Sequence, residues 1–181
     1  MTADTVTDAV VNWLGAPNVL GLVQVLDAAP WFLDGHAWEL DAGLGWGGIG
    51  LIHLLHEDEH RIAMGGAHGG LKQVTYHVGL QTIFKYVIPN GWDPTQQATG
   101  YRQSLNQLLD GIRTRLRQDR TLGTSTGGVT VGEDGAILQV GEGDGSGAPD
   151  ITIDRDLPRR DGAFLTSLNL IQFTIIEIAA T

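Results

Sequence analysis

Glycine is the residue that most limits what this chain can fold into. The 181 residues include 26 glycines, roughly twice the usual share of about 7%. Each glycine inside a helix costs up to about 1 kcal/mol relative to alanine, so a long helical rod is excluded. The glycines gather at turns and in two stretches, 34–50 and 123–147, which are therefore predicted to form long glycine-rich loops.

The charge balance and the absence of cysteine exclude further classes. Eleven basic residues face 21 acidic ones, giving a net charge of −10, and a surface of this sign does not wrap nucleic acid. Without cysteine there are no disulfides and no thiolate chemistry. The length fits one domain over residues 1–181. Residues 1–8 lack the pattern of a secretory signal, and no apolar run reaches the ~20 residues of a membrane span, so no membrane partner is expected.

Two segments show the periodicity of amphipathic helices. A short N-terminal helix is predicted up to Gly15, and a longer one follows the capping residue Asp93, with its stable part starting near Tyr101 because of Gly100. The first has apolar residues three and four positions apart at Val6, Ala9, Val10, Trp13 and Leu14. The second has one apolar stripe at Tyr101, Leu105, Leu108, Leu109, Ile112 and Leu116.

The remaining segments read as strands. Alternation predicts a strand over 74–88, with Val74 and Tyr76 on one face and Thr75 and His77 on the other. Further strands are predicted at 19–26, 49–55, 61–64, 129–131, 137–140, 151–153 and 164–178, the last as a central strand covered on both sides. The expected fold is α+β, a mainly antiparallel sheet packed on one side by one long helix and a short N-terminal helix.

Residues 56–60 read His-Glu-Asp-Glu-His and fit the letters of the zinc-protease motif H-E-x-x-H. On a helix, His56 and His60 would hold the metal and Glu57 would activate its water. The neighbouring segments are β-like and the middle of the motif is charged, so we expect a solvated hairpin tip instead. A zinc-dependent hydrolase stays the alternative function, and a binding domain with an acidic surface is a third possibility.

The arginines of the second helix are the main basic feature. Intersubunit pairing with an acidic neighbour is favoured over DNA binding, because so much of the chain is acidic. The subunit-contact candidates are Arg113, Arg115, Arg117 and Arg120. The glycine-rich stretch lacks a phosphate-loop signature and no serine lies in a nucleophile elbow. We therefore expect no catalytic residues, no metal and no cofactor.

One block of the sequence resembles a known family. Residues 61–66 (Arg-Ile-Ala-Met-Gly-Gly) and 69–78 (Gly-Gly-Leu-Lys-Gln-Val-Thr-Tyr-His-Val) are similar to tail terminator proteins of actinobacterial long-tailed phages. The resemblance extends to the Trp13-Leu14 helix, to the segment 22–31 with its Pro30, to the helix over 93–123 and into the last strand. It thus covers most of the chain.

The resemblance implies a structural protein of the virion neck. Such proteins form a ring, hexameric in this family, that caps the tail tube, ends its polymerisation and joins it to the head-completion (stopper) protein. The implied partners are other copies of the chain, the tail tube protein and the head-completion protein, after assembly in the host cytoplasm. DNA would pass through the channel without specific binding, and carboxylates there would repel its phosphates. The channel-lining candidates are Glu57, Asp58 and Glu59.

Overall fold

The computed structural model describes residues 3–15, 18–27, 40, 43–63, 71–119, 121–123, 125–126, 129–130, 137–140 and 151–180. Two helices and a mixed, mostly antiparallel sheet confirm the α+β class. Neither helix in this part of the chain is long and apolar enough to cross a membrane. The elements are α1 (Ala3–Leu14), β1 (Leu22–Asp27), β2 (Trp46–Ala63), β3 (Leu71–Val87), α2 (Pro94–Gln118), β4 (Ser125–Thr126), β5 (Val129–Thr130), β6 (Ile137–Val140), β7 (Thr152–Arg155), β8 (Arg159–Asp161) and β9 (Phe164–Ala180).

Three long strands form the body of the sheet. Strand β3 pairs antiparallel with β2 on one side and with β9 on the other, and the β3–β9 register runs unbroken from Leu71↔Ala180 to Val87↔Phe164. Strands β6, β7 and β8 pair with the far edge of β9. Strand β9 is therefore central, as predicted, although Leu168 on its outer face is 43% exposed and the cover of that face is incomplete.

Strand β1 makes the sheet mixed, which differs from the expected pattern. It pairs parallel with β2, from Leu22↔Gly48 to Asp27↔Ile52. A parallel neighbour needs a crossover of a dozen or more residues, and the segment between the two strands is long enough to provide one. The glycine and proline residues that mark turns in the sequence therefore could not show that β1 runs parallel to β2.

Glycines at the start of β2 mark close packing, so the predicted loop over 34–50 is wrong at its end. Trp46 to Gly50 belong to the strand. A Cβ on Gly48 would lie 2.9 Å from Leu108 of α2, and one on Gly50 would lie 2.8 Å from Leu80. Glycine in a strand often permits such an approach. The rest of that predicted loop, apart from residues 40 and 43–45, lies outside the described residues, as does most of 123–147 outside β4, β5 and β6.

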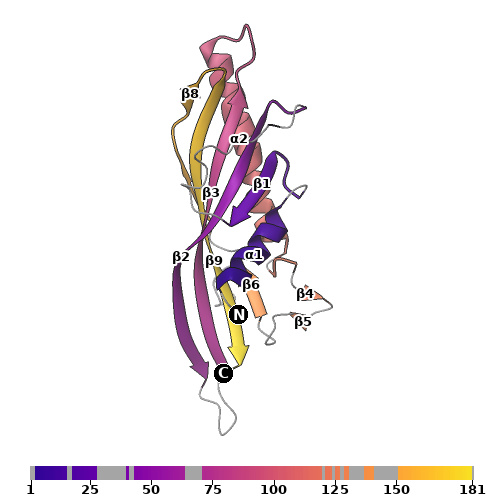
Figure 1. Cartoon of the computed structure of the whole chain (residues 1–181), viewed down its shortest axis with the longest axis vertical. Helices are drawn as coiled ribbons and strands as arrows, with labels where there is room; N and C mark the ends of the chain where they lie inside the picture. The colour runs from indigo at the N-terminus through magenta and orange to yellow at the C-terminus, as the bar shows by residue number, and fades with distance from the viewer. Residues whose placement is uncertain are drawn as a thin grey trace.

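The core lies between the helices and one face of the sheet, and both helices pack on this face (Figure 1). Helix α1 confirms the predicted N-terminal helix and contributes Val6, Val10 and Leu14. Phe84 and Tyr101 meet edge to face with ring centroids 5.5 Å apart. The buried residues of α2 are Tyr101, Leu105, Leu108, Leu109, Ile112 and Leu116.

Two buried side-chain hydrogen bonds join β9 to its neighbours, one to α2 and one to β3. The Tyr101 hydroxyl donates to Ser167 Oγ at 2.6 Å, and the Tyr76 hydroxyl donates to Glu177 Oε2 at 2.7 Å. Desolvation, followed by the contact with Glu177, raises the pKa of Tyr76 above its ordinary range. The hydroxyl therefore stays a donor to the carboxyl group of Glu177, a residue that is only 1% exposed.

Helix α2 begins at the predicted cap, Asp93, and is helical from Pro94 onward, so only the expectation that its stable part starts near Tyr101 is wrong. The carboxylate of Asp93 accepts hydrogen bonds from the amides of Thr95 and Gln96, and the Gln96 side chain returns a bond to the Asp93 amide, which forms a capping box. Such a cap stabilises a helix by about 1 kcal/mol. It compensates for Gly100, which stands where Tyr86 and Trp92 leave no room for a side chain.

Replacing Gly100 tests this packing. Gly100→Ala adds a methyl group that overlaps the Tyr86 hydroxyl and approaches Trp92 within 2.8 Å. We expect the free energy of unfolding to fall by about 1–3 kcal/mol, although alanine raises helix propensity by about 1 kcal/mol. Urea unfolding followed by circular dichroism measures the change. The exposed Thr114→Ala is the control, and a Gly100→Ala variant as stable as that control would contradict the packing.

Candidate assembly surfaces

The acidic segment, Glu57, Asp58 and Glu59, lies inside strand β2 and not at a hairpin tip as predicted. Residues 56–60 pair with β3 from His56↔His77 to His60↔Gln73. The strand continues to Ala63, so the hairpin end lies farther along the chain. Residues 56–60 are polar on both faces of the strand. They stay in the strand because β3 supplies the hydrogen bonds of their backbone.

The acidic segment presents its charges on two faces of the sheet. Glu57 and Glu59 stand opposite Tyr76 and Val74, on the face that carries the core, and Asp58 stands opposite Thr75 on the other face. All three side chains are exposed. Strand β1 ends its pairing at Ile52, so in the described part of the chain no strand pairs with this edge of β2 beyond Ile52. The charges therefore sit on an open sheet edge.

Asp58 is held between two histidines from neighbouring strands. His56 Nε2 lies 3.0 Å from Asp58 Oδ1, and His77 Nε2 lies 3.2 Å from Asp58 Oδ2. Desolvation raises the pKa of Asp58, but the hydrogen bonds from His56 and His77 outweigh it and the pKa lies below its usual value. Asp58 is thus an anion that the two imidazoles share.

The strand geometry of residues 56–60 does not reproduce the metalloprotease arrangement. That motif needs a helix, where residues four apart lie one above the other, whereas His56 and His60 are separated here by extended backbone. Within the described residues, no group of three or more histidine, aspartate or glutamate side chains is arranged to hold a metal ion.

Among the arginines of α2, Arg115 has an internal role that the sequence did not reveal. Its guanidinium carbon lies 3.4 Å from the centroid of the Trp13 ring. Its Nε donates to the Trp13 carbonyl at 3.2 Å, and the Trp13 indole donates to the Arg115 carbonyl at 2.9 Å. Arg115 therefore joins α2 to α1.

The other arginines differ in whether they form an ion pair within the chain. Arg113 forms an exposed ion pair of 3.2 Å with Asp110, one turn away. Arg117 is exposed, and within the described part of the chain its side chain makes no ion pair. Arg120 lies outside the described residues. Of the predicted contact set, Arg113 and Arg117 remain available, because surface ion pairs are weak and exchangeable.

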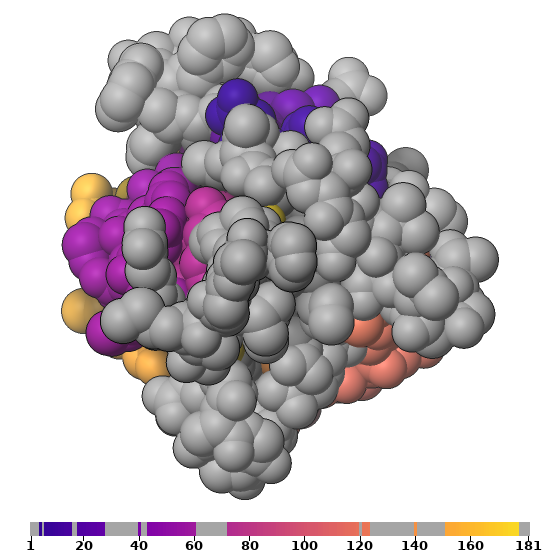
Figure 2. Space-filling model, turned by 90° about the horizontal axis from the view of Figure 1, so that it is seen from below, coloured from indigo at the N-terminus to yellow at the C-terminus, as the bar shows by residue number. Residues whose placement is uncertain are grey.

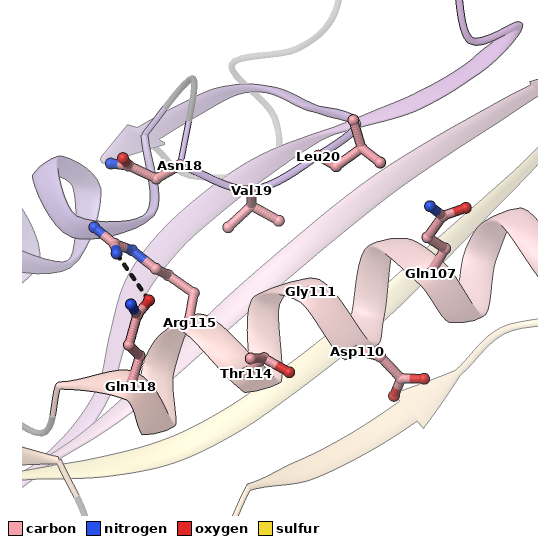
Figure 3. Close-up of a pocket in the computed structure, with 9 residues that line it drawn as sticks. All are labelled: Asn18, Val19, Leu20, Gln107, Asp110, Gly111, Thr114, Arg115 and Gln118. Atoms are coloured by element: carbon pink, nitrogen blue, oxygen red, sulfur yellow. Dashed lines mark hydrogen bonds between the residues drawn. The ribbon is translucent and has the colours of Figure 1, made fainter.

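An open groove runs beside α2 (Figure 3). It has a volume of about 510 Å³ and lies between the α1–β1 connection and the helix. Val19 packs closely against Gly111 in its wall, since a Cβ on Gly111 would lie 3.2 Å from Val19. The lining residues are Asn18, Val19, Leu20, Gln107, Asp110, Gly111, Thr114, Arg115 and Gln118.

Sequence reasoning missed this groove because it assigned residues 19–26 wholly to a strand. Leu20 precedes β1 and is 53% exposed. In the sequence it belongs to one apolar run with the strand, and nothing in that run separates it from the buried residues. The one hydrogen bond drawn between lining residues joins Arg115 Nη1 to Gln118 Oε1 at 3.0 Å (Figure 3). The groove thus has a polar rim without a converging set of charges.

Stability measurements separate the roles of two arginines. Arg115→Ala removes the stacking on Trp13 and a side-chain hydrogen bond, so we expect the free energy of unfolding to fall by about 1–3 kcal/mol. Arg117→Ala removes an exposed side chain and should change it by less than about 0.5 kcal/mol. Chemical denaturation of both variants measures the difference, and equal stabilities would contradict the internal role of Arg115.

The titration of Asp58 tests the shared imidazole contact. In the double variant His56→Ala, His77→Ala we expect the pKa of Asp58 to rise toward its usual value, because both hydrogen bonds are lost. The folded-state pKa is depressed, so the stabilisation is present above the unfolded-state pKa and is lost as the pH falls through the folded-state pKa. Carbon-13 NMR of the Asp58 carboxyl group measures its pKa. His60→Ala is the control, and an unchanged Asp58 midpoint in the double variant would refute the contact.

Comparison with known proteins adds no assignment to these surfaces. No protein-family model matches the chain, and no curated protein matches it.

Proposed function

We propose that this protein is a structural component of a phage neck. In this role, copies of the chain form a ring on the end of the tail tube, six in the family that the sequence resembles. The ring ends tube polymerisation and joins the tail to the head-completion protein. DNA passes through its channel during ejection without specific binding.

The observation that carries the proposal is the separation of opposite charges on one body. The acidic segment lies on β2, and the available arginines lie on the C-terminal half of α2. Figure 2 shows the surface of β2 in purple on one side of the molecule and the end of α2 in salmon on the other. A closed ring requires two different complementary surfaces on each subunit, and this arrangement supplies them.

The sequence resemblance supports the same proposal. The similar block at 61–66 and 69–78 falls on the end of β2 and the beginning of β3, apart from residues 64–70, which lie outside the described residues. These strand ends extend beyond the end of α2 (Figure 1). An extended hairpin that leaves its own helix layer is suited to contact another chain.

The net charge is compatible with the passage of DNA. A channel lined by arginine or lysine would bind phosphates and hold the DNA, with an affinity that depends on salt. The chain carries a net charge of −10. Asp58, on the face of β2 away from the core, remains a candidate for the channel surface.

A conditional stop codon in the gene for this chain tests the role. In a non-suppressing host, we expect phage tails of abnormal length and heads without tails, seen by negative-stain electron microscopy. The same phage in a suppressor host is the control and should give normal virions. Virions that lack the chain but have tails of normal length joined to heads would overturn the proposal.

A further inference from the structure

The arginines of α2 that remain available form a pair on one side of the helix. Arg113 and Arg117 are four residues apart, so their Cα atoms lie about 6 Å apart along the axis, one helical turn. Arg117 is exposed, and the ion pair of Arg113 with Asp110 is a surface contact of 3.2 Å whose aspartate side chain is 62% exposed. Both guanidinium groups can therefore bind carboxylates from another molecule.

The acidic segment contains a matching pair of carboxylates. Glu57 and Glu59 lie two residues apart on the same face of β2, which places them about 6.6 Å apart along the strand. Glu59 contacts Lys72 at 3.4 Å in an exposed pair, and Glu57 has no ion pair within the described residues. The spacing of the carboxylates along the strand is thus close to the spacing of the guanidinium groups along the helix.

A single molecule cannot bring the two pairs together. The purple surface of β2 and the salmon surface of the C-terminal part of α2 lie on opposite sides of the molecule (Figure 2). Two copies of β2 would not pair edge to edge through this segment, because like charges would then lie opposite each other. Charged edge strands reject such general pairing and favour a partner surface of the opposite sign.

We propose that Glu57 and Glu59 of one copy form ion pairs with Arg113 and Arg117 of the next copy. The two surfaces differ, so the contact is heterologous and repeats from subunit to subunit until a ring closes. Asp58 lies on the other face of β2 and takes no part. The proposal specifies the subunit contact of the ring proposed above and rests on that function for its biological role.

The strength of this contact depends on salt. Exposed ion pairs are individually weak, so the two pairs mainly set the orientation and specificity of the contact. Exposed charges are screened beyond about 8 Å at physiological ionic strength. Association of the full chain, measured by sedimentation velocity, is therefore expected to weaken by about two- to thirtyfold between 20 mM and 500 mM salt.

Charge reversal tests the pairing directly. Glu57→Lys with Glu59→Lys should weaken self-association at least tenfold, and Arg113→Glu with Arg117→Glu should do the same. Equimolar mixing of the two variants should restore association, because the two reversed surfaces carry opposite charges and complement each other, and the two unreversed surfaces do the same. Asp154→Lys and Arg102→Glu, which change exposed charges elsewhere, are the controls and should retain wild-type association.

Cross-linking of introduced cysteines locates the contact, and the absence of cysteine makes the chain a suitable background. Mixing Glu57→Cys with Arg117→Cys should give a cross-linked dimer with a short bismaleimide, which spans the gap that two long side chains leave and a direct disulfide cannot, while Glu57→Cys with Arg102→Cys should give at least fivefold less. Equal yields in both mixtures, no cross-linking, or charge-reversed variants that associate normally would overturn this contact.

The outcomes separate this inference from the proposed function. If stop-codon phages show abnormal tails but charge reversal leaves association intact, the neck function stands and the contact is wrong. If charge reversal leaves association intact but slows DNA ejection, Glu57 and Glu59 line the channel instead. If cross-linking succeeds while stop-codon phages are normal, the contact stands and the neck function is wrong.

Discussion

The structure depends on the antiparallel ladder between β3 and β9. This ladder runs without a bulge from Leu71↔Ala180 to Val87↔Phe164, and every other strand of the sheet attaches to one of its two members or to β2. Because paired residues point to the same side, the ladder also sorts the side chains of both strands into a core face and an outer face. Helix α2 then packs its apolar stripe on the core face.

The length of the ladder explains why the charges are separated. Strands β2, β3 and β9 extend beyond the end of α2 (Figure 1). Apolar residues such as Ile52 and Leu80 are buried where the helices cover the sheet, and Glu57 and Glu59 are exposed farther along β2. The basic end of α2 lies on the opposite side of the molecule (Figure 2). A body of this kind presents two surfaces of unlike charge.

Periodicity predicted those elements whose burial follows one face. The alternation of Val74, Tyr76 and Val78 identified β3, and the spacing of Val6, Val10 and Leu14 identified α1, because burial selects apolar residues at those positions. The prediction of strand was missing at residues 46–48 and 56–60. There the strand is maintained by pairing with β3, while Gly48 admits the side chain of Leu108 and charged residues face solvent. In such segments the residue types are set by the side chains packed against them and by exposure to solvent, and they do not reveal that the backbone is a strand.

The candidate site shows the same division. The sequence by itself determined the fold class, the acidic excess and the run of arginines in one helix, because these follow from residue type and local spacing. Only the tertiary structure decided that Arg115 stacks on Trp13, that Arg117 stays exposed and that Glu57 and Asp58 face opposite ways. Those properties depend on contacts between residues far apart in the chain, such as the 102 positions that separate Trp13 from Arg115. Local spacing carries no information about which distant residues meet.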